Sequence, residues 1–200
     1  MNDDYNILIA GVGGQGNLVC GRILSEAALQ NGLRPVIGET FGASRRGGTV
    51  LTHLRISKQD RGPLIPKGKA DLLLGMEPLE ALRAAIEYAS QQTVAVVSAA
   101  IVETPSSLAE TEKYPPVGKI TESLQSLCGE AIALDPIESL EKSGGLRFLN
   151  SYMLGAISSL KHIPMCREEI RKAVETTLRN PEMNLAAYDA GVADIVKLQR

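Results

Sequence analysis

The chain has 200 residues, a formal net charge of −2 and an apolar share of 44%, with 4% aromatic residues and no Trp. This length and composition predict one domain over residues 1–200 with a mainly aliphatic core. The nearly neutral charge argues against nucleic acid or an anionic membrane as a partner of the whole chain.

The first residues and the cysteines bear on location. Residues 1–4 are acidic where a secretory signal would be basic. The longest apolar-leaning run, at 93–102, is shorter than the roughly 20 residues that a bilayer requires. Cys20, Cys128 and Cys166 are odd in number and far apart, which is typical of reduced thiols. We therefore expect a cytoplasmic protein.

Runs of strand and helix character alternate along the chain. Strand-like segments are expected at 5–10, 34–38, 49–56, 71–75, 93–97, 101–102 and 131–134. Helical segments are expected at 18–31, 78–89, 120–127, 136–142, 148–160, 165–178 and 181–196. This alternation predicts an α/β fold, a Rossmann-like three-layer α/β/α sandwich with a mostly parallel sheet.

One connection departs from this pattern. The strand at 5–10, the first helix and the strand at 34–38 are typical of a βαβ unit, with Glu39 just past its end. The link at 39–48 is glycine-rich, and it is marginal in length for a parallel crossover, which needs about a dozen residues or more. We therefore expect the strand at 49–56 to be antiparallel or irregular.

A glycine-rich turn separates the first strand from the first helix. Three of its glycines fit the G-x-G-x-x-G spacing of dinucleotide-binding turns, and its residues are Gly11, Gly13, Gly14, Gln15 and Gly16. Such a turn directs backbone N–H groups and the positive end of a helix dipole toward an anion. Two interpretations stay open. The turn binds a phosphate or carboxylate, or it serves only tight turning and close helix–strand packing.

A second candidate for anion binding is the loop that precedes the strand at 49–56. It combines two guanidinium groups with exposed backbone N–H groups, in the run Ser44, Arg45, Arg46, Gly47 and Gly48. The alternative is a solvated turn whose arginines pair with nearby acids. Because this loop emerges at the same sheet edge as the glycine turn, we expect the two loops to face one crevice.

Other candidate chemistry is sparse. Glu39 lies where a dinucleotide fold places its ribose-binding acid, although the unusual loop favours a solvated carboxylate or an arginine partner. His53 and His162 are isolated, and Asn150 and Asn184 are interpreted as capping or core hydrogen-bonding residues. There is no C-x-x-C pair, no G-x-S-x-G and no P-loop, so no catalytic residue and no metal ligand is predicted.

Several motifs occur in an order found in a known family. They are the turn at 11–16, Ser-x-Arg-Gly-Gly at 44–48, Pro-Leu-Ile-Pro at 63–66, Ala-Asp-Leu-Leu-Leu-Gly-Met-Glu-Pro-Leu-Glu-Ala at 70–81, the asparagine-led helix at 150–160 and Asn-Leu-x-Ala-x-x-x-Gly at 184–191. Over nearly the whole chain, this set resembles the gamma-type module of 2-oxoacid:ferredoxin oxidoreductases, most closely the beta subunits of the indolepyruvate type. Arg45 departs from the family pattern, in which Gln is common.

The resemblance implies a subunit of an enzyme complex that oxidatively decarboxylates a 2-oxoacid, of the indolepyruvate or aryl-pyruvate type, to an acyl-CoA and passes electrons to ferredoxin. It also implies that thiamine diphosphate and iron–sulfur clusters lie on a large catalytic partner, with CoA as co-substrate. The sequence has no clustered cysteines and no Gly-Asp-Gly motif, in agreement with a chain that holds no cofactor of its own. Such a chain would be inactive alone and would help form the active-site mouth or the CoA site.

Two alternatives stay open. One is a stand-alone oxidoreductase of the NAD- or FAD-binding Rossmann class. The other is an anion- or CoA-binding module without a reaction of its own.

Overall fold

The computed structural model describes residues 4–42, 48–102, 114–161 and 163–198. Within these residues, six strands form one sheet in the order β2-β3-β1-β4-β5-β6. The strands are β1 (Asp4–Val12), β2 (Arg34–Phe41), β3 (Thr49–Ser57), β4 (Leu72–Gly75), β5 (Val94–Ser98) and β6 (Glu130–Leu134). The segment expected as a short strand at 101–102 lies outside the sheet, so that prediction was wrong.

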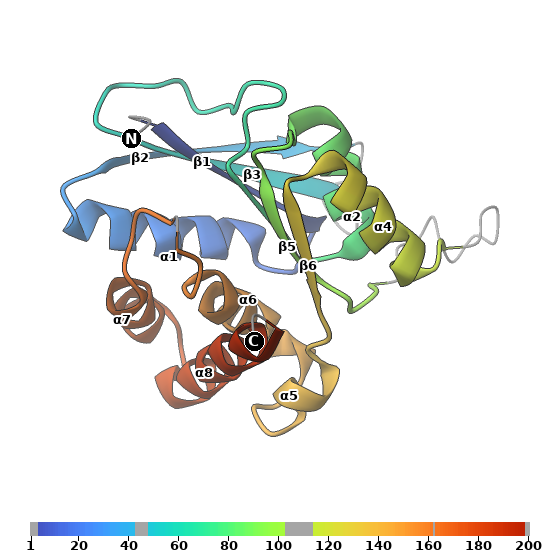
Figure 1. Ribbon diagram of the computed structural model, residues 1–200. Helices are drawn as coiled ribbons and strands as arrows, with labels where there is room; N and C mark the ends of the chain where they lie inside the picture. Colours follow the sequence, from blue (N-terminus) through green and yellow to red (C-terminus); the bar gives the residue numbers. More distant parts are fainter. Residues whose placement is uncertain (1–3, 43–47, 103–113, 162, 199–200) are drawn as a thin grey trace.

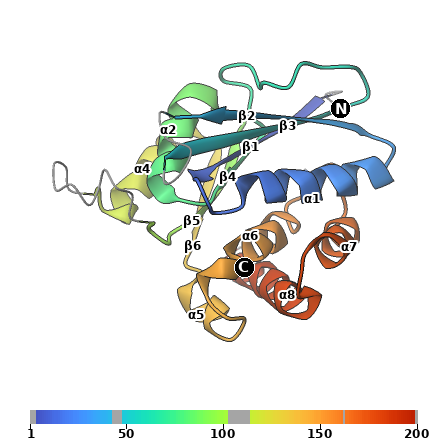
Figure 2. The ribbon, with the colours of Figure 1, turned by 180° about the vertical axis from the view of Figure 1, so that it is seen from behind.

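Helices cover both faces of the sheet (Figures 1 and 2). One face carries α1 (Asn17–Gln30), α5 (Ile137–Glu141), a short 3-10 turn η1 (Leu146–Phe148), α6 (Leu149–Ile157), α7 (Arg167–Thr177) and α8 (Pro181–Leu198). The other face carries α2 (Pro78–Tyr88) and α4 (Val117–Leu127). The predicted three-layer α/β/α sandwich is thus confirmed.

The direction of β3 confirms the prediction of one antiparallel strand. It runs antiparallel to both of its neighbours, β2 and β1, whereas β1, β4, β5 and β6 are parallel. A short link cannot carry the chain back across the sheet, so the strand after it pairs antiparallel with β2.

The predicted βαβ unit is present, because β1 and β2 are both antiparallel to β3 and so run parallel to each other, but its two strands are not adjacent. β2 is not a neighbour of β1, because β3 is inserted between them and pairs with β1 from Asp4 opposite Ser57 to Val12 opposite Thr49. Glu39 was expected just after the strand but lies inside β2, opposite Thr52 of β3. Pairing with β3 extends β2 to Phe41, beyond residue 38, where the strand-like sequence ends.

The helix α6 is the centre of the helical layer next to α1. Eight of its nine residues are buried, which confirms the prediction of a buried helix here. It crosses α8 with the two backbones in contact, because a Cβ atom at Gly155 would overlap the carbonyl oxygen of Tyr188, and one at Gly191 would overlap that of Tyr152. Only glycine allows such an approach at these two positions.

Candidate functional site

The predicted glycine turn lies at the carboxyl end of β1, the edge of a parallel sheet at which ligands usually bind. Gly16 is the N-cap of α1 in the left-handed conformation, with φ 84° and ψ 26°, and no side chain caps the helix. Gly14 also has a positive φ, of 108°, and is exposed. The uncapped N–H groups at the start of α1 are therefore available to an anion.

Gln15 holds the turn together from inside. Its Oε1 accepts a hydrogen bond of 2.8 Å from the backbone N–H of Val12, and its Nε2 donates one of 2.9 Å to the carbonyl oxygen of Met76, just after β4. A Cβ at Gly11 would lie 2.5 Å from that Oε1, so the glycine makes room for the amide. Gln15 was expected at a ligand, but its side chain is engaged within the chain.

The glycine turn and the arginine loop meet at their ends. The backbone N–H of Gly13 donates a hydrogen bond of 3.0 Å to the carbonyl oxygen of Gly48. The remaining predicted residues of that loop, Ser44, Arg45, Arg46 and Gly47, lie outside the described residues. Gly48, at the end of the arginine loop, therefore lies beside the glycine turn at the carboxyl edge of β1.

A buried amide beside the turn was not found by sequence analysis. The Nδ2 of Asn17, in the first turn of α1, donates a hydrogen bond of 3.0 Å to the carbonyl oxygen of Val50. Its Oδ1 is buried and has no hydrogen-bond partner among the described residues. A buried acceptor without a donor costs about 1–3 kcal/mol, and a bound anion would not relieve this cost because it is also an acceptor.

Two buried carboxylates lie just after the carboxyl end of β4. Glu77 caps α2, since its Oε2 accepts a hydrogen bond of 2.8 Å from the Glu80 N–H and its Oε1 accepts one from the Tyr114 hydroxyl. Burial raises the pKa of the Glu77 carboxyl. Glu80 pairs through Oε1 with Arg83 at 2.5 Å, while its Oε2 is buried without a partner among the described residues. Sequence analysis identified both glutamates only as part of a family motif.

His53 has a structural role. The ring is fully buried, its Nδ1 accepts a hydrogen bond of 3.3 Å from the Ile65 N–H, and its Nε2 lies 3.3 Å from Thr40 Oγ1. These contacts require the neutral tautomer with the proton on Nε2, and burial lowers the pKa of the ring. The other histidine, His162, lies outside the described residues.

The two asparagines of the sequence analysis lie on α6 and α8. Asn184 is buried, accepts a hydrogen bond of 2.6 Å from Ser151 Oγ and donates one of 2.7 Å to the carbonyl oxygen of Arg179, which confirms its core role. Asn150 accepts a bond of 2.8 Å from the Ser151 N–H. Its amide nitrogen lies 3.2 Å from where a Cβ of Gly16 would be, so it contacts the glycine turn.

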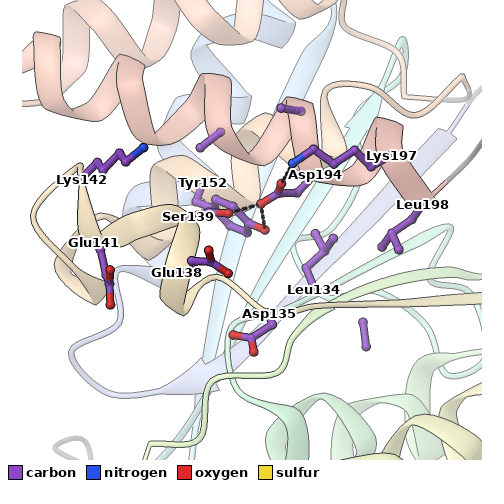
Figure 3. Close-up of a pocket in the computed structure, with 13 residues that line it drawn as sticks. Leu134, Asp135, Glu138, Ser139, Glu141, Lys142, Tyr152, Asp194, Lys197 and Leu198 are labelled. Atoms are coloured by element: carbon purple, nitrogen blue, oxygen red, sulfur yellow. Dashed lines mark hydrogen bonds and ion pairs between the residues drawn. The ribbon is translucent and has the colours of Figure 1, made fainter.

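A cavity of about 830 Å³ lies farther along the same edge, between α5 and α8 (Figure 3). Its centre is Asp194, which accepts hydrogen bonds from Ser139, Tyr152 and Lys197. Burial opposes ionisation of Asp194, but these three donors outweigh it and lower the pKa of the carboxyl. Because the donors all come from the chain itself, this network serves to hold α5, α6 and α8 together.

Two absences within residues 4–42, 48–102, 114–161 and 163–198 bear on metals and membranes. No group of three or more His, Cys, Asp or Glu side chains there is arranged to hold a metal ion. None of the helices in these ranges has the length and apolarity needed to cross a bilayer.

Comparison with known proteins identifies the family. The profile described as pyruvate ferredoxin/flavodoxin oxidoreductase matches residues 6–193. The indolepyruvate oxidoreductase subunit IorB of Archaeoglobus fulgidus is 35% identical over 188 residues, which cover 93% of this chain and 92% of the relative. The corresponding subunit of Methanothermobacter thermautotrophicus is 33% identical over 94% of this chain and 96% of its own length.

Solved structures agree in fold. The gamma subunit of a keto/oxoacid ferredoxin oxidoreductase from Geobacter sulfurreducens has a TM-score of 0.69 and 24% identity, covering 96% of this chain and 99% of that chain. A 2-oxoglutarate:ferredoxin oxidoreductase from Magnetococcus marinus, solved with 2-oxoglutarate, coenzyme A and succinyl-CoA bound, has a TM-score of 0.69 and 20% identity over 98% of this chain and 32% of its own. With its motifs in family order and the fold they predict, this chain belongs to the pyruvate ferredoxin/flavodoxin oxidoreductase family.

Proposed function

We propose that this chain is the small subunit of an indolepyruvate-type 2-oxoacid:ferredoxin oxidoreductase and that residues 1–200 act as one module. The observation that carries the proposal is the 35% identity to an indolepyruvate oxidoreductase subunit over more than nine-tenths of both chains. The complex would decarboxylate an aryl pyruvate, transfer the acyl group to CoA and pass two electrons to ferredoxin. The three free cysteines agree with a cytoplasmic complex.

The redox and carbanion chemistry would belong to a larger partner subunit that carries thiamine diphosphate and iron–sulfur clusters. The cysteines of this chain do not fit a cluster. Cys20 and Cys128 are buried and Cys166 is exposed, and burial raises the pKa of Cys20 to about 12, although a cluster ligand must be a thiolate. This chain would therefore contribute binding and positioning of substrates.

The part of the active site that this chain supplies would be the approach of CoA. The support is geometric, since the uncapped start of α1 at Gly16 and the hydrogen bond from Gly13 to Gly48 join two anion-binding elements at one edge. We propose that Gly11, Gly13, Gly14, Gly16 and Gly48 shape this site, with Gln15 supporting the turn. Ser44, Arg45, Arg46 and Gly47 would complete it from the loop that ends at Gly48.

The fold argues against the alternative of an NAD-binding oxidoreductase. A dinucleotide fold places the ribose-binding acid at the end of the parallel strand next to β1. Here that neighbour is the antiparallel β3, and Glu39 lies one strand farther out, half-buried inside β2. The G-x-G-x-x-G spacing therefore occurs here beside a strand order that differs from that of a dinucleotide-binding fold.

The experiment is reconstitution with a thiamine-dependent partner, followed by steady-state kinetics of indolepyruvate-dependent ferredoxin reduction. Neither chain alone should be active. Arg46→Ala should raise the KM for CoA about tenfold, the value of one lost charged hydrogen bond, and leave the KM for the oxoacid unchanged. Arg22→Ala, which removes an exposed arginine from α1, is the control and should behave as wild type.

Two outcomes would count against these assignments separately. Wild-type CoA kinetics in the Arg46→Ala complex would remove the arginine loop from the site. Tight binding of NADH or FAD by the isolated chain, measured by calorimetry, would contradict the subunit role itself and favour the stand-alone oxidoreductase.

A further inference from the structure

A pocket of about 320 Å³ lies between the start of α6 and the start of α8. Its lining includes two arginines and three asparagine side chains: Arg147, Arg179, Asn150, Asn180 and Asn184. We call it the Arg147–Arg179 pocket. Neither arginine belongs to the glycine turn at 11–16 or to the loop at 44–48.

The charge of this pocket is uniformly positive. No Asp or Glu is among the described residues that line it, and neither arginine forms an ion pair with a described carboxylate. Glu182, in the first turn of α8, is not part of the lining. Both arginines are exposed, and the Arg147 guanidinium lies over the Phe148 ring, with its carbon 5.0 Å from the ring centre. Two guanidinium groups without an acidic partner are typical of an anion site.

Buried hydrogen bonds fix the wall that carries Arg179. The Nδ2 of Asn184 donates to the carbonyl oxygens of Arg179 and Asn180, over 2.7 and 3.1 Å, and Ser151 of α6 holds its Oδ1. Asn180 has a positive φ of 58°, which a non-glycine residue adopts only when its surroundings hold it there. The position of Arg179 relative to α6 is therefore set by the core and needs no ligand to form.

The helix ends add to the positive field. The pocket lies at the N-termini of α6 and α8, which have 9 and 18 residues. The Asn150 side chain connects this pocket with the glycine turn, because it lines the pocket and also contacts Gly16. An anion bound here would lie beside the start of α1 as well.

We propose that the Arg147–Arg179 pocket binds a phosphate-type anion, held by the two guanidinium groups and the Asn150 amide. The chemistry selects a tetrahedral oxyanion that can accept paired N–H donors from planar guanidinium forks. This site lies beyond the glycine turn and does not depend on the proposed role in CoA use. The anion has two possible sources, a phosphate group of a nucleotide-type co-substrate or free inorganic phosphate.

The test is calorimetry of the full chain with inorganic phosphate, at constant ionic strength adjusted with sodium chloride. Wild type should bind phosphate saturably, and phosphate should raise its Tm by mass action. The double variant Arg147→Gln/Arg179→Gln should lose affinity at least about tenfold, because each arginine supplies a charged hydrogen bond. Arg22→Gln, with one positive charge removed elsewhere, should match wild type.

Folding is checked by circular dichroism and by the Tm without phosphate, which the substitutions should leave unchanged. Arg179→Lys serves as a second variant, since it keeps the charge but loses the planar fork and should bind with intermediate affinity. Absence of saturable binding by wild type, or equal binding by wild type and both sets of variants, would overturn the proposal.

Competition separates the two sources of the anion. Displacement of phosphate by CoA but not by dephospho-CoA would assign the pocket to the phosphate on the ribose, and displacement by both would assign it to the diphosphate. Displacement by neither would assign it to a free anion. Each of these results supports an anion site in the Arg147–Arg179 pocket and identifies its ligand. None of them depends on the kinetics of the Arg46→Ala complex.

Discussion

The N–H of Gly13 donates to the carbonyl oxygen of Gly48 over 3.0 Å, and this bond ties the turn after β1 to the residue that precedes β3. Two loops that are far apart in sequence thus share one edge of the sheet. The inserted strand β3 is the cause, because its antiparallel pairing with β1 brings its first residue to the last residue of β1. The geometry of this edge therefore depends on a strand order that ordinary dinucleotide folds do not have.

Loss of the Gln15 amide should loosen this turn. Gln15→Ala removes the acceptor for the Val12 N–H and the donor to the Met76 carbonyl, so we expect a loss of about 1–3 kcal/mol in the free energy of unfolding. Urea titration followed by circular dichroism measures it. Gln15→Glu keeps an acceptor for Val12 but places an oxygen against the Met76 carbonyl, and it should not rescue stability. Wild-type stability of Gln15→Ala would show that the turn forms without the bridge.

The left-handed backbone at Gly16 should be intolerant of a side chain. Gly16→Ala should destabilise the fold by about 1–2 kcal/mol, because φ is 84° there and the new methyl group would lie 3.2 Å from the Asn150 amide nitrogen. Gly62→Ala is the matched control, since Gly62 has open space around it and should be neutral within about 0.5 kcal/mol. Equal midpoints of thermal unfolding for the two variants would contradict this.

The buried ring of His53 should make stability depend on pH. Its pKa in the folded chain is lowered by burial, so the unfolded chain binds a proton more readily as the pH falls below about 6.5, the ordinary histidine value. The contribution of this residue is fully present above that pH and is lost as the pH falls toward the folded-state pKa. Unfolding free energies measured from pH 8 to pH 5 should decline for wild type and change less for His53→Gln. The same pH slope in both proteins would exclude His53 as the cause.

The crossing of α6 and α8 should be the least tolerant part of the helical layer. Gly155→Ala or Gly191→Ala places a methyl group on a backbone carbonyl of the other helix, and we expect a loss of about 3 kcal/mol or more, or failure to fold. Gly118→Ala, at an exposed position of α4 with open space, should be neutral or slightly stabilising. Soluble expression followed by thermal unfolding compares all three variants.

Local patterns predicted the elements but not all of their neighbours. The apolar run before Gly11 and the helix after Gly16 are local features, and the structure has both. The length of the link before β3 predicted an antiparallel or irregular strand. Strand order, however, depends on pairing between residues that are far apart in the sequence. The position of β3 between β2 and β1 could therefore not be predicted from the link. Glu39 was misplaced for the same reason.

The candidate sites show the same limit. The glycine turn was recognisable because glycine spacing is a sequence property. The unpaired Oδ1 of Asn17 and the capping bond from Tyr114 to Glu77 depend on burial and on contacts across the fold, which no local pattern reports. Arg147 and Arg179 look like two unrelated surface residues until α6 and α8 bring them to one pocket.

The glycine crossing of α6 and α8 also has a mechanical consequence. Two helices in contact through their backbones cannot slide or rotate past each other without a collision between main-chain atoms, so they transmit force as one rigid piece. If this subunit shifts against a partner during turnover, α6 and α8 must therefore move together, with the backbone segments that directly precede them. The main chain around the Arg147–Arg179 pocket would then keep its shape while the subunit moves.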